Sequence, residues 1–558
     1  MTTKNNKYLH MKTKLSIFLM LICFTSIFSQ EITGSWKGEL NFQGSKLPLV
    51  FNIKKNKEGY TSTADSPLQK AKDIPVDKTV FEKNKLTLEI SAIGGTYTGT
   101  LEGKKITGTF SQNGISLPLI LESSGEKRNS AAKNETLQLP QNLNESIKRI
   151  DDFISYLEKN NAEAGEVSLF KNGKEIYKRN FGQQNLPSSP GKHSAFQIGS
   201  VTKTITASMI FKLIEKKQLN LNDKLSKFFP EVPNAEKITI SQMLNHTSGL
   251  GDYVQGKDDM MWLINKSDDT KIMARIKEQG SVFEPGTDKR YSNTGYYLLT
   301  KILEKITKKS YAENLKETFT APLQLNNLYT AGQNPANVYL PYDFTGKWKS
   351  KEDFDFNNVV GVGDIATNPT TLNIIINHIF EGKIVSKASL SEMMPKGDDN
   401  FGKGIITVPF YSKKYYGHSG GTYGTNSLMA YNPEDKISFS YSLNADRIGA
   451  NNFAIGVLSL LYNKEYEYPK LNNEKIPVSD LQKYPGEYSS KDIPLGLKIF
   501  IEDDSLFAQG KDQPAFPLEY VEKDQFKFDN AGVKIIFTPE KKQLTLIQNG
   551  NSFIFDKK

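Results

Sequence analysis

The sequence predicts a multidomain protein in which a central domain of helices and antiparallel strands is flanked by two small all-β domains. Residues 31–124 and residues 476–558 alternate polar and apolar side chains in short runs separated by glycine and asparagine, which is typical of antiparallel strands. Between these two parts the pattern changes to long amphipathic helical segments with strand signals at both ends. The chain has 558 residues, too many for one ordinary hydrophobic core.

The first 29 residues are typical of a secretory signal peptide. Residues 1–29 combine a basic start with an apolar stretch that is shorter than the ~20 residues of a membrane span. An uncleaved anchor is the alternative, because Ile27 stands where a smaller residue is usual before a cleavage site, and Met11 is an alternative start. The only cysteine, Cys23, lies inside this segment, so we expect a mature protein without disulfides, in the periplasm or outside a bacterial cell.

The charge of the chain does not indicate a nucleic-acid partner. The formal net charge is +9, and four lysines of the signal segment reduce it to 9 − 4 = +5 for the mature chain. Lysines alternate with acids along the polar segments, and no basic stripe is present. We therefore expect no nucleic acid among the partners.

The boundaries of the predicted domains follow from these changes of pattern. Residues 125–142 lack any periodicity and are predicted to form a linker after the first all-β domain. The central domain is assigned to residues 143–465 and begins with an amphipathic helix and a hairpin around Asn172-Gly173. Strand signals return at its end, so we expect one sheet that joins both ends of this domain, as in an α/β or α+β fold. Residues 476–558 form the second all-β domain.

One segment of the central domain places a serine and a lysine on the same face of a helix. Residues 196–215 read FQIGSVTKTITASMIFKLIE, which is mostly small or apolar after the serine. A helix of this composition is buried on most sides, so Lys203, one turn after Ser200, must lose most of its hydration. An amine held in this way can activate a neighbouring hydroxyl as a nucleophile. The alternative is a capping serine with a lysine whose amine reaches solvent.

Two further motifs give the serine its context. Ser-x-x-Lys alone is a weak signal, because it occurs five times in the chain. Tyr-x-Asn and His-Ser-Gly each occur once, at residues 291–293 and 418–420, and follow Ser200 in that order. Taken singly, Tyr291 could be a core tyrosine, Asn293 a helix N-cap and His418 a surface residue on a strand.

In this order, the three motifs resemble those of the serine β-lactamase and penicillin-binding protein superfamily. The resemblance is closest to its class C-like branch of serine hydrolases, D-amino-acid peptidases and esterases, and covers about residues 143–465. It implies a β-lactamase-like fold for the central domain. This sequence departs from the related signature in its last two motifs, where Tyr-Ser-Asn and His-Ser-Gly replace Ser-Asp-Asn and Lys-Thr-Gly.

The resemblance implies three catalytic residues. Ser200 would be the acylated nucleophile, at a helix N-terminus whose positive field favours an alkoxide-like oxygen. Lys203 would hold or remove its proton. Tyr291 would pass protons to the leaving group and later activate water, and we expect the charge of Lys203 to make its phenolate more accessible.

It also implies four substrate-binding residues. Asn293 would orient a substrate amide. The backbone N–H of Gly421 would form an oxyanion hole with that of the serine, and Gly420 would let the strand approach the substrate closely. His418 would replace the cationic lysine of the penicillin-recognising signature, and an ordinary histidine pKa near 6.5 predicts a mainly neutral ring at pH 7.

Other candidate motifs are interpreted as structural. His246 belongs to the HTSGL loop and is predicted to form a turn rather than to act in catalysis. GVGDIA at residues 361–366 matches a dinucleotide fingerprint, but no clear strand precedes it, and the resemblance implies a glycine-rich turn beside the site instead. The four histidines of the mature chain lack His-x-x-x-His spacing, so we expect neither a metal nor a cofactor.

Together these features predict an exported serine hydrolase that acts through a Ser200 acyl-enzyme on amide or ester bonds. Its substrates would be peptidoglycan-type or D-amino-acid peptides, or small esters, with the cell wall as a further partner. One alternative is a catalytically silent, penicillin-binding-like receptor for peptides or cell-wall fragments. Another concerns the flanking domains, which could be lipocalin-like barrels for small ligands, with interiors either packed or open.

Overall fold

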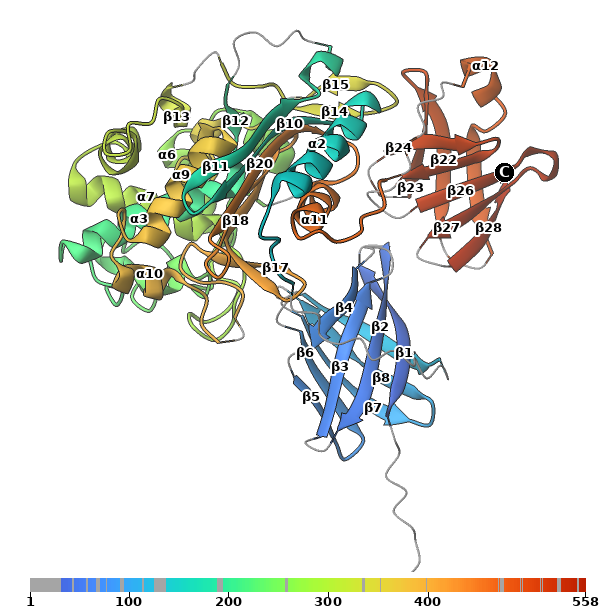
Figure 1. Cartoon of the computed structure of the whole chain (residues 1–558), viewed down its shortest axis with the longest axis horizontal. Helices are drawn as coiled ribbons and strands as arrows, with labels where there is room; N and C mark the ends of the chain where they lie inside the picture. Colours follow the sequence, from blue (N-terminus) through green and yellow to red (C-terminus); the bar gives the residue numbers. More distant parts are fainter. Residues whose placement is uncertain are drawn as a thin grey trace, which may run out of the picture.

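The structure is a computed structural model of the chain. It describes residues 32–558 except residues 43–44, 57–58, 67–70, 77, 91–94, 113–114, 125–136, 188–193, 256–258, 334–336, 352, 398, 470, 472–475, 492, 494, 512, 514, 529–532 and 549–550. The expected signal peptide and most of the expected linker lie outside the described residues. Within the described part, no helix is both long and apolar enough to cross a membrane. Figure 1 shows a large part made of helices and strands and two smaller β structures. One β structure precedes the large part in the sequence and the other follows it.

The first β structure is a nine-stranded antiparallel sheet in the order β4-β3-β2-β1-β9-β8-β7-β6-β5. The sheet curls until β3 and β5 meet, where the hydroxyls of Ser62 and Thr79 lie 2.6 Å apart. Its interior is filled by buried aromatic and aliphatic side chains such as Phe51 and Tyr97. The strands are β1 Gly34–Phe42, β2 Ser45–Asn56, β3 Gly59–Ser66, β4 Ala71–Val76, β5 Lys78–Glu82, β6 Lys85–Ile90, β7 Gly95–Glu102, β8 Lys105–Gln112 and β9 Ile115–Ser123.

The central sheet joins the two ends of its sequence, as the strand signals predict. Its order is β11-β10-β20-β19-β18-β17, and β10 from the beginning pairs antiparallel with β20 from the end. The hairpin between β10 and β11 turns at Asn172 and Gly173, which both have positive φ. The strands are β10 Glu163–Lys171, β11 Lys174–Phe181, β17 Ile406–Phe410, β18 Lys413–Gly421, β19 Asn426–Asn432 and β20 Ile437–Asp446, with β14 Tyr342–Phe344 and β15 Trp348–Ser350 beside β20.

Helices cover both faces of this sheet and create two separate cores. On one face α2 and α11 pack around Phe153 and Phe453. On the other face α9 lies against the strands, and the helical part with α3 and α7 forms the larger core behind it. The helices are α2 Asn144–Lys159, α3 Thr202–Glu215, α4 Ile240–Leu244, α5 Asp259–Ile264, α6 Asp269–Gln279, α7 Asn293–Thr307, α8 Tyr311–Leu315, α9 Pro369–Glu381, α10 Lys387–Met393 and α11 Ala450–Leu461.

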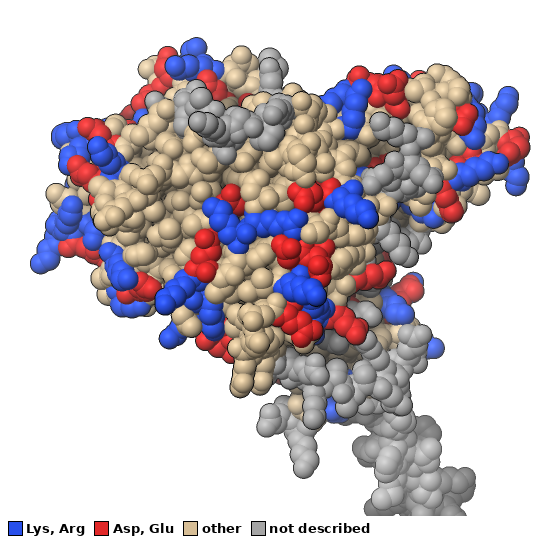
Figure 2. Space-filling model, turned by 45° about the horizontal axis from the view of Figure 1, so that its top comes forward, with Lys and Arg blue, Asp and Glu red and all other residues tan. Residues whose placement is uncertain are grey.

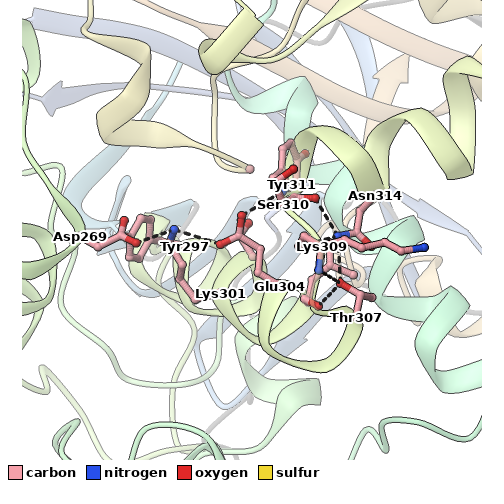
Figure 3. A network of polar contacts seen from close by, with 12 residues as sticks. Asp269, Tyr297, Lys301, Glu304, Thr307, Lys309, Ser310, Tyr311 and Asn314 are labelled. Atoms are coloured by element: carbon pink, nitrogen blue, oxygen red, sulfur yellow. Dashed lines mark hydrogen bonds and ion pairs between the residues drawn. The ribbon is translucent and has the colours of Figure 1, made fainter.

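The helical segment after the Tyr-x-Asn motif is interrupted once, between α7 and α8. Lys308 adopts a left-handed conformation that ends α7, and Ser310 starts α8 through a capping box. Figure 3 shows the polar network across this break. Glu304 accepts a hydrogen bond from the backbone N–H of Tyr311 at 2.9 Å and forms an ion pair with Lys301, which also binds Asp269 on α6. The network fixes α7, whose first residue is Asn293.

A small three-stranded sheet borders the start of α3. It consists of β12 Phe196–Gln197, β16 Ala366–Thr367 and β13 Leu328–Tyr329, in that order. Because β12 leads directly into the serine segment, this sheet fixes where α3 begins.

The last β structure is a closed barrel of eight antiparallel strands, preceded by the short helix α12 Val478–Leu481. Closure follows from the pairing of β21 with β28. Buried side chains such as Tyr488, Phe526 and Phe537 fill its interior, which favours a packed barrel over an open ligand-binding one. The strands are β21 Gly486–Ser490, β22 Gly496–Glu502, β23 Ser505–Gly510, β24 Phe516–Glu522, β25 Gln525–Phe528, β26 Val533–Thr538, β27 Gln543–Gln548 and β28 Asn551–Lys557.

The surface charges are mixed. On the face that Figure 2 shows, basic and acidic side chains lie next to one another, and no broad area is basic only. This distribution agrees with the alternation of lysines and acids in the sequence.

Candidate active site

Ser200 and Lys203 meet where α3 begins. A short 3-10 turn, Gly199–Val201, precedes α3, and Lys203 lies in its first turn. The Lys203 amine Nζ lies 3.0 Å from Ser200 Oγ and donates a second hydrogen bond of 3.0 Å to the carbonyl of Val362. Ser200 itself is partly exposed, whereas the side chain of Lys203 is completely buried. The amine of Lys203 therefore does not reach solvent, which excludes the alternative of a lysine that extends to the surface.

Burial changes the acid–base chemistry of this lysine. It lowers the pKa of Lys203 from 10.5 to about 7, against the opposing field of the Asp252 carboxylate. A large fraction of the amine is then neutral at neutral pH. A neutral amine beside a hydroxyl can accept its proton.

The Tyr291 hydroxyl is buried and has no hydrogen-bond partner among the described residues. Its ring lies 4.9 Å from Lys203 Nζ. Burial raises the pKa of Tyr291 above its ordinary value of 10.0, and the nearby Ser200 hydroxyl opposes this only in part. The expected lowering of the phenolate pKa is therefore wrong, because burial and the charge of Asp252 raise the pKa more than the Ser200 hydroxyl lowers it. The Tyr291 hydroxyl therefore keeps its proton at neutral pH.

His246 packs against Tyr291. Its ring stacks on the Tyr291 ring with centroids 4.3 Å apart. Its Nδ1 accepts a hydrogen bond from the backbone N–H of Ser292 at 3.2 Å, and its backbone has a φ of 64°. Burial, Lys203 and His418 lower the pKa of His246 well below 6.5, so the ring is neutral. This arrangement agrees with a structural turn.

Asn293 begins α7 and faces an acid that no sequence motif singles out. Its side-chain Nδ2 donates to Asp252 Oδ2 at 2.9 Å. Burial raises the pKa of Asp252, while the Val254 N–H, Lys203 and Asn293 oppose that rise. Asp252 follows the HTSGL loop after a single glycine, and the only sequence signal for it is this proximity.

His418 lies on β18 and is almost fully buried, with 4% of its surface exposed. Its Nδ1 lies 2.6 Å from the carbonyl oxygen of Ser419. Because a carbonyl only accepts, Nδ1 carries the proton and the neutral ring has Nε2 as an acceptor. Burial first, and then Lys203, lower the pKa of His418 to about 4. The expected titration near pH 6.5 is wrong for this reason, and the interpretation as a surface residue is wrong as well.

The end of β18 packs directly against the serine turn. A Cβ atom at position 420 would lie 2.8 Å from the backbone nitrogen of Ser200, so only glycine fits there. Gly199, with a φ of 52°, makes the same close approach from the other side, to the backbone of Gly421. The structure thus brings Gly420 and Gly421 beside Ser200.

The glycine-rich turn at residues 361–364 lies beside the site and has no dinucleotide-binding context. Asp364 holds it by accepting hydrogen bonds from the Gly361 N–H at 2.7 Å and from the Ala331 N–H at 3.2 Å. Burial raises the pKa of Asp364 to about 6. The turn presents the Val362 carbonyl to Lys203, a role that the sequence alone did not indicate.

The comparisons with known proteins agree with this fold. The family model described as Beta-lactamase matches residues 150–455. The teichoic acid D-alanine hydrolase of Staphylococcus aureus is 27% identical over 295 residues, which cover 50% of this chain and 70% of that protein. Penicillin-binding protein 4* of Bacillus subtilis is 26% identical over 412 residues, covering 67% of this chain and 90% of that protein.

Two solved structures extend the comparison. The octameric penicillin-binding protein homologue from Pyrococcus abyssi has a TM-score of 0.50 at 25% identity, covering 74% of this chain and 100% of that chain. The D-amino acid amidase of Ochrobactrum anthropi, at 23% identity and a TM-score of 0.51, shares the fold over 57% of this chain and 98% of that chain.

The fold and its relatives define an enzyme of the serine hydrolase class. More particularly, the chain belongs to the beta-lactamase family.

Proposed function

We propose that this chain is an exported hydrolase that cleaves esters or amides of D-amino acids through an acyl-enzyme on Ser200. The observation that carries the proposal is the contact of 3.0 Å between Lys203 Nζ and Ser200 Oγ, combined with the pKa of about 7 that burial gives this lysine. These two features supply a nucleophile and a base at neutral pH without any further group.

In the acylation step, Ser200 Oγ attacks the substrate carbonyl carbon while its proton moves to the neutral amine of Lys203. The backbone N–H groups of Ser200 and Gly421 stabilise the oxyanion that forms. The intermediate then collapses, and the bond to the leaving group breaks. Tyr291, which keeps its proton because burial raises its pKa, donates that proton to the leaving oxygen or nitrogen and takes one back from the Lys203 ammonium.

Deacylation reverses these transfers with water as the nucleophile. The neutral Lys203 amine, directly or through the Tyr291 hydroxyl, accepts a proton from water as its oxygen attacks the ester carbonyl. Ser200 leaves with a proton, and the amine is neutral again. Asn293 orients the acyl group by hydrogen bonding.

The relatives favour substrates built on D-amino acids. The Staphylococcus aureus relative is named as a hydrolase of D-alanine on teichoic acid, and the Ochrobactrum anthropi structure as a D-amino acid amidase. An export signal at residues 1–29 would bring the enzyme to substrates of the cell wall.

Labelling with a fluorescent fluorophosphonate tests the proposal. We expect the parent to be labelled and the Ser200→Ala variant to lose both labelling and turnover, with a change in stability within about 1 kcal/mol. Ser189, which also begins a Ser-x-x-Lys motif, supplies the control: Ser189→Ala should retain full labelling. Labelling that survives in Ser200→Ala would identify a different nucleophile. A panel of D-alanyl esters, D-amino-acid amides, D-Ala-ended peptides and β-lactams then identifies the preferred bond.

A further inference from the structure

We propose that Asp252 is a positioning residue of this site: it fixes the side-chain amide of Asn293 and supplies the counter-charge of Lys203. The inference rests on the proposed function, because it assigns a role in the acylation of Ser200. Asp252 belongs to none of the three motifs.

The backbone around Asp252 is fastened to the start of α7. Thr294 Oγ1 donates to the carbonyl of Gly251 at 2.6 Å and accepts from the N–H of Tyr253 at 3.0 Å. The carboxylate atom Oδ1 of Asp252 accepts from the N–H of Val254 at 3.0 Å. Because both neighbours are held, the carboxylate has a defined direction.

That carboxylate determines how Asn293 lies. Asp252 Oδ2 accepts from Asn293 Nδ2 at 2.9 Å. A carboxylate only accepts hydrogen bonds, so the amide nitrogen of Asn293 must face it. The amide oxygen of Asn293 is then left as the acceptor for an N–H of the substrate. Without the Asp252 carboxylate, this contact would no longer determine which way the amide nitrogen and the amide oxygen of Asn293 point.

The same carboxylate acts on Lys203. Its negative charge favours the ammonium form of the lysine, and the lysine in turn favours the carboxylate. The phenol rings of Tyr291 and Tyr296 lie 4.9 and 5.7 Å from Lys203 Nζ and carry no charge at neutral pH, because burial raises the pKa of both.

Two histidines also face the lysine. Burial, and then the charge of Lys203, lower the pKa of His246 in the HTSGL loop and of His418 on β18. Both rings are therefore neutral at neutral pH. Asp364, on the turn that binds Lys203 through Val362, has its carboxylate engaged by backbone N–H groups of that turn. Among these groups, Asp252, which binds Asn293 at the start of α7, is the one whose charge favours the ammonium form of Lys203.

This role predicts the direction of a pH shift. Acylation requires the neutral amine, so its rate rises with pH through the pKa of Lys203. A negative neighbour raises that pKa. Removing the negative charge should therefore move the rise to lower pH, whereas a merely structural contact would lower the rate equally at every pH.

The experiment measures the rate constant of fluorophosphonate labelling against pH in the full-length protein. In Asp252→Asn and Asp252→Ser we expect the midpoint to fall by about half a pH unit or more. Asn293→Ala, which retains the carboxylate, should keep the midpoint of the parent. The matched control is Asp269→Asn, an acid on α6 that binds Lys301, and it too should leave the midpoint unchanged.

A second readout tests the orientation of Asn293. For each variant we compare kcat/KM on an N-acyl-D-alanyl ester, which offers an amide N–H, with kcat/KM on p-nitrophenyl acetate, which offers none. Asp252→Ser and Asn293→Ala should each reduce this ratio about tenfold, and the double variant should reduce it no further. The double variant removes the Asn293 donor and the Asp252 acceptor together. Its labelling midpoint therefore tests the charge of Asp252 even where the Asp252 single variant misfolds.

The outcomes separate this inference from the function on which it rests. A parent without labelling at Ser200 contradicts the proposed function itself. A labelled parent whose midpoint stays fixed in folded Asp252 variants, as judged by thermal unfolding, overturns the charge role. Additive losses in the double variant overturn the positioning role.

Discussion

At the scale of single residues, burial changes the protonation of Lys203 at neutral pH. Its pKa falls from 10.5 to about 7 in the folded protein. An unfolded lysine keeps its ordinary pKa, so between pH 7 and pH 10.5 the unfolded state binds more protons than the folded state. The free energy of unfolding therefore rises with pH across this window, and the full cost of burying the lysine is present below it.

Lys203→Met should accordingly be inactive but more stable than the parent. We expect a gain of about 1–3 kcal/mol near neutral pH, because lost hydrogen bonds offset part of the relief. The gain should shrink as pH rises through the window. Urea unfolding at neutral and alkaline pH measures it, with Lys216→Met, an exposed position just after α3, as the control. A variant that is less stable at every pH would show that the lysine contacts outweigh its desolvation.

We expect His418 to influence the preference among substrates. Its Nδ1–H donates to the Ser419 carbonyl, so Nε2 is an acceptor and repels a carboxylate. We expect weak β-lactamase activity and faster turnover of esters whose leaving group ends in a carboxamide than of matched esters ending in a carboxylate. Because the pKa of His418 is about 4, the ratio of kcat/KM on the carboxylate esters to kcat/KM on the carboxamide esters should rise in the parent only well below pH 6.5, where protonation of Lys203 lowers both values.

His418→Lys should raise kcat/KM on the carboxylate substrates about fivefold to tenfold at neutral pH, because it replaces a neutral acceptor by a cation. The carboxamide substrates should not gain. Efficient hydrolysis of penicillin by the parent at neutral or alkaline pH would contradict this interpretation.

At the scale of elements, the site depends on the contact between the end of β18 and the turn before α3. Gly420→Ala would place a methyl group 2.8 Å from the backbone nitrogen of Ser200 and push the strand away. The oxyanion donors would separate, so we expect turnover to fall about 100-fold or more. Overpacking should also lower stability, by about 1–3 kcal/mol.

Gly363→Ala is the matched control, because its methyl group would lie 3.6 Å from Gly199, an ordinary contact. It should retain most of the activity. Equal losses in both variants would show that the glycine-rich surroundings, not the strand contact, set the rate.

At the scale of the whole molecule, the C-terminal barrel is joined to the central sheet by a buried ion pair. Arg447, just after β20, donates from Nε to Glu519 Oε1 at 2.7 Å and from Nη2 to Glu519 Oε2 at 3.1 Å. Ser505 of the barrel also donates to the Thr345 carbonyl at 2.7 Å. The preceding residue, Asp446, accepts from Asn426, which pairs with Gly421 in the site.

Glu519→Gln should weaken this junction by about 2–3 kcal/mol, because it removes the carboxylate by which the barrel binds the buried Arg447 guanidinium. Thermal unfolding and limited proteolysis of the full chain should show the barrel released at a lower temperature. Glu522→Gln, an exposed position on the same strand β24, should change neither. An unchanged melting profile in Glu519→Gln would show that the barrel is held by its other contacts.

The sequence by itself determined the parts of this protein that follow from short-range patterns. Alternation located the strands, and the Asn172-Gly173 pair located a hairpin. The i, i+3 spacing on one apolar helix was enough to bring Ser200 beside Lys203, because helix geometry fixes that relation wherever the helix lies. The order of the three motifs then indicated the family.

Only the tertiary structure decided what these residues can do. The Val362 carbonyl binds Lys203 and the Asp252 carboxylate binds Asn293, each from a distant segment, and no local pattern brings these groups together. The pKa values of Tyr291 and His418 depart from what the sequence suggested, and the pKa of Lys203 falls in the direction that its apolar helix indicated, by an amount that the helix alone does not determine. Each is set by desolvation, which depends on every segment packed around a group rather than on its neighbours in the chain.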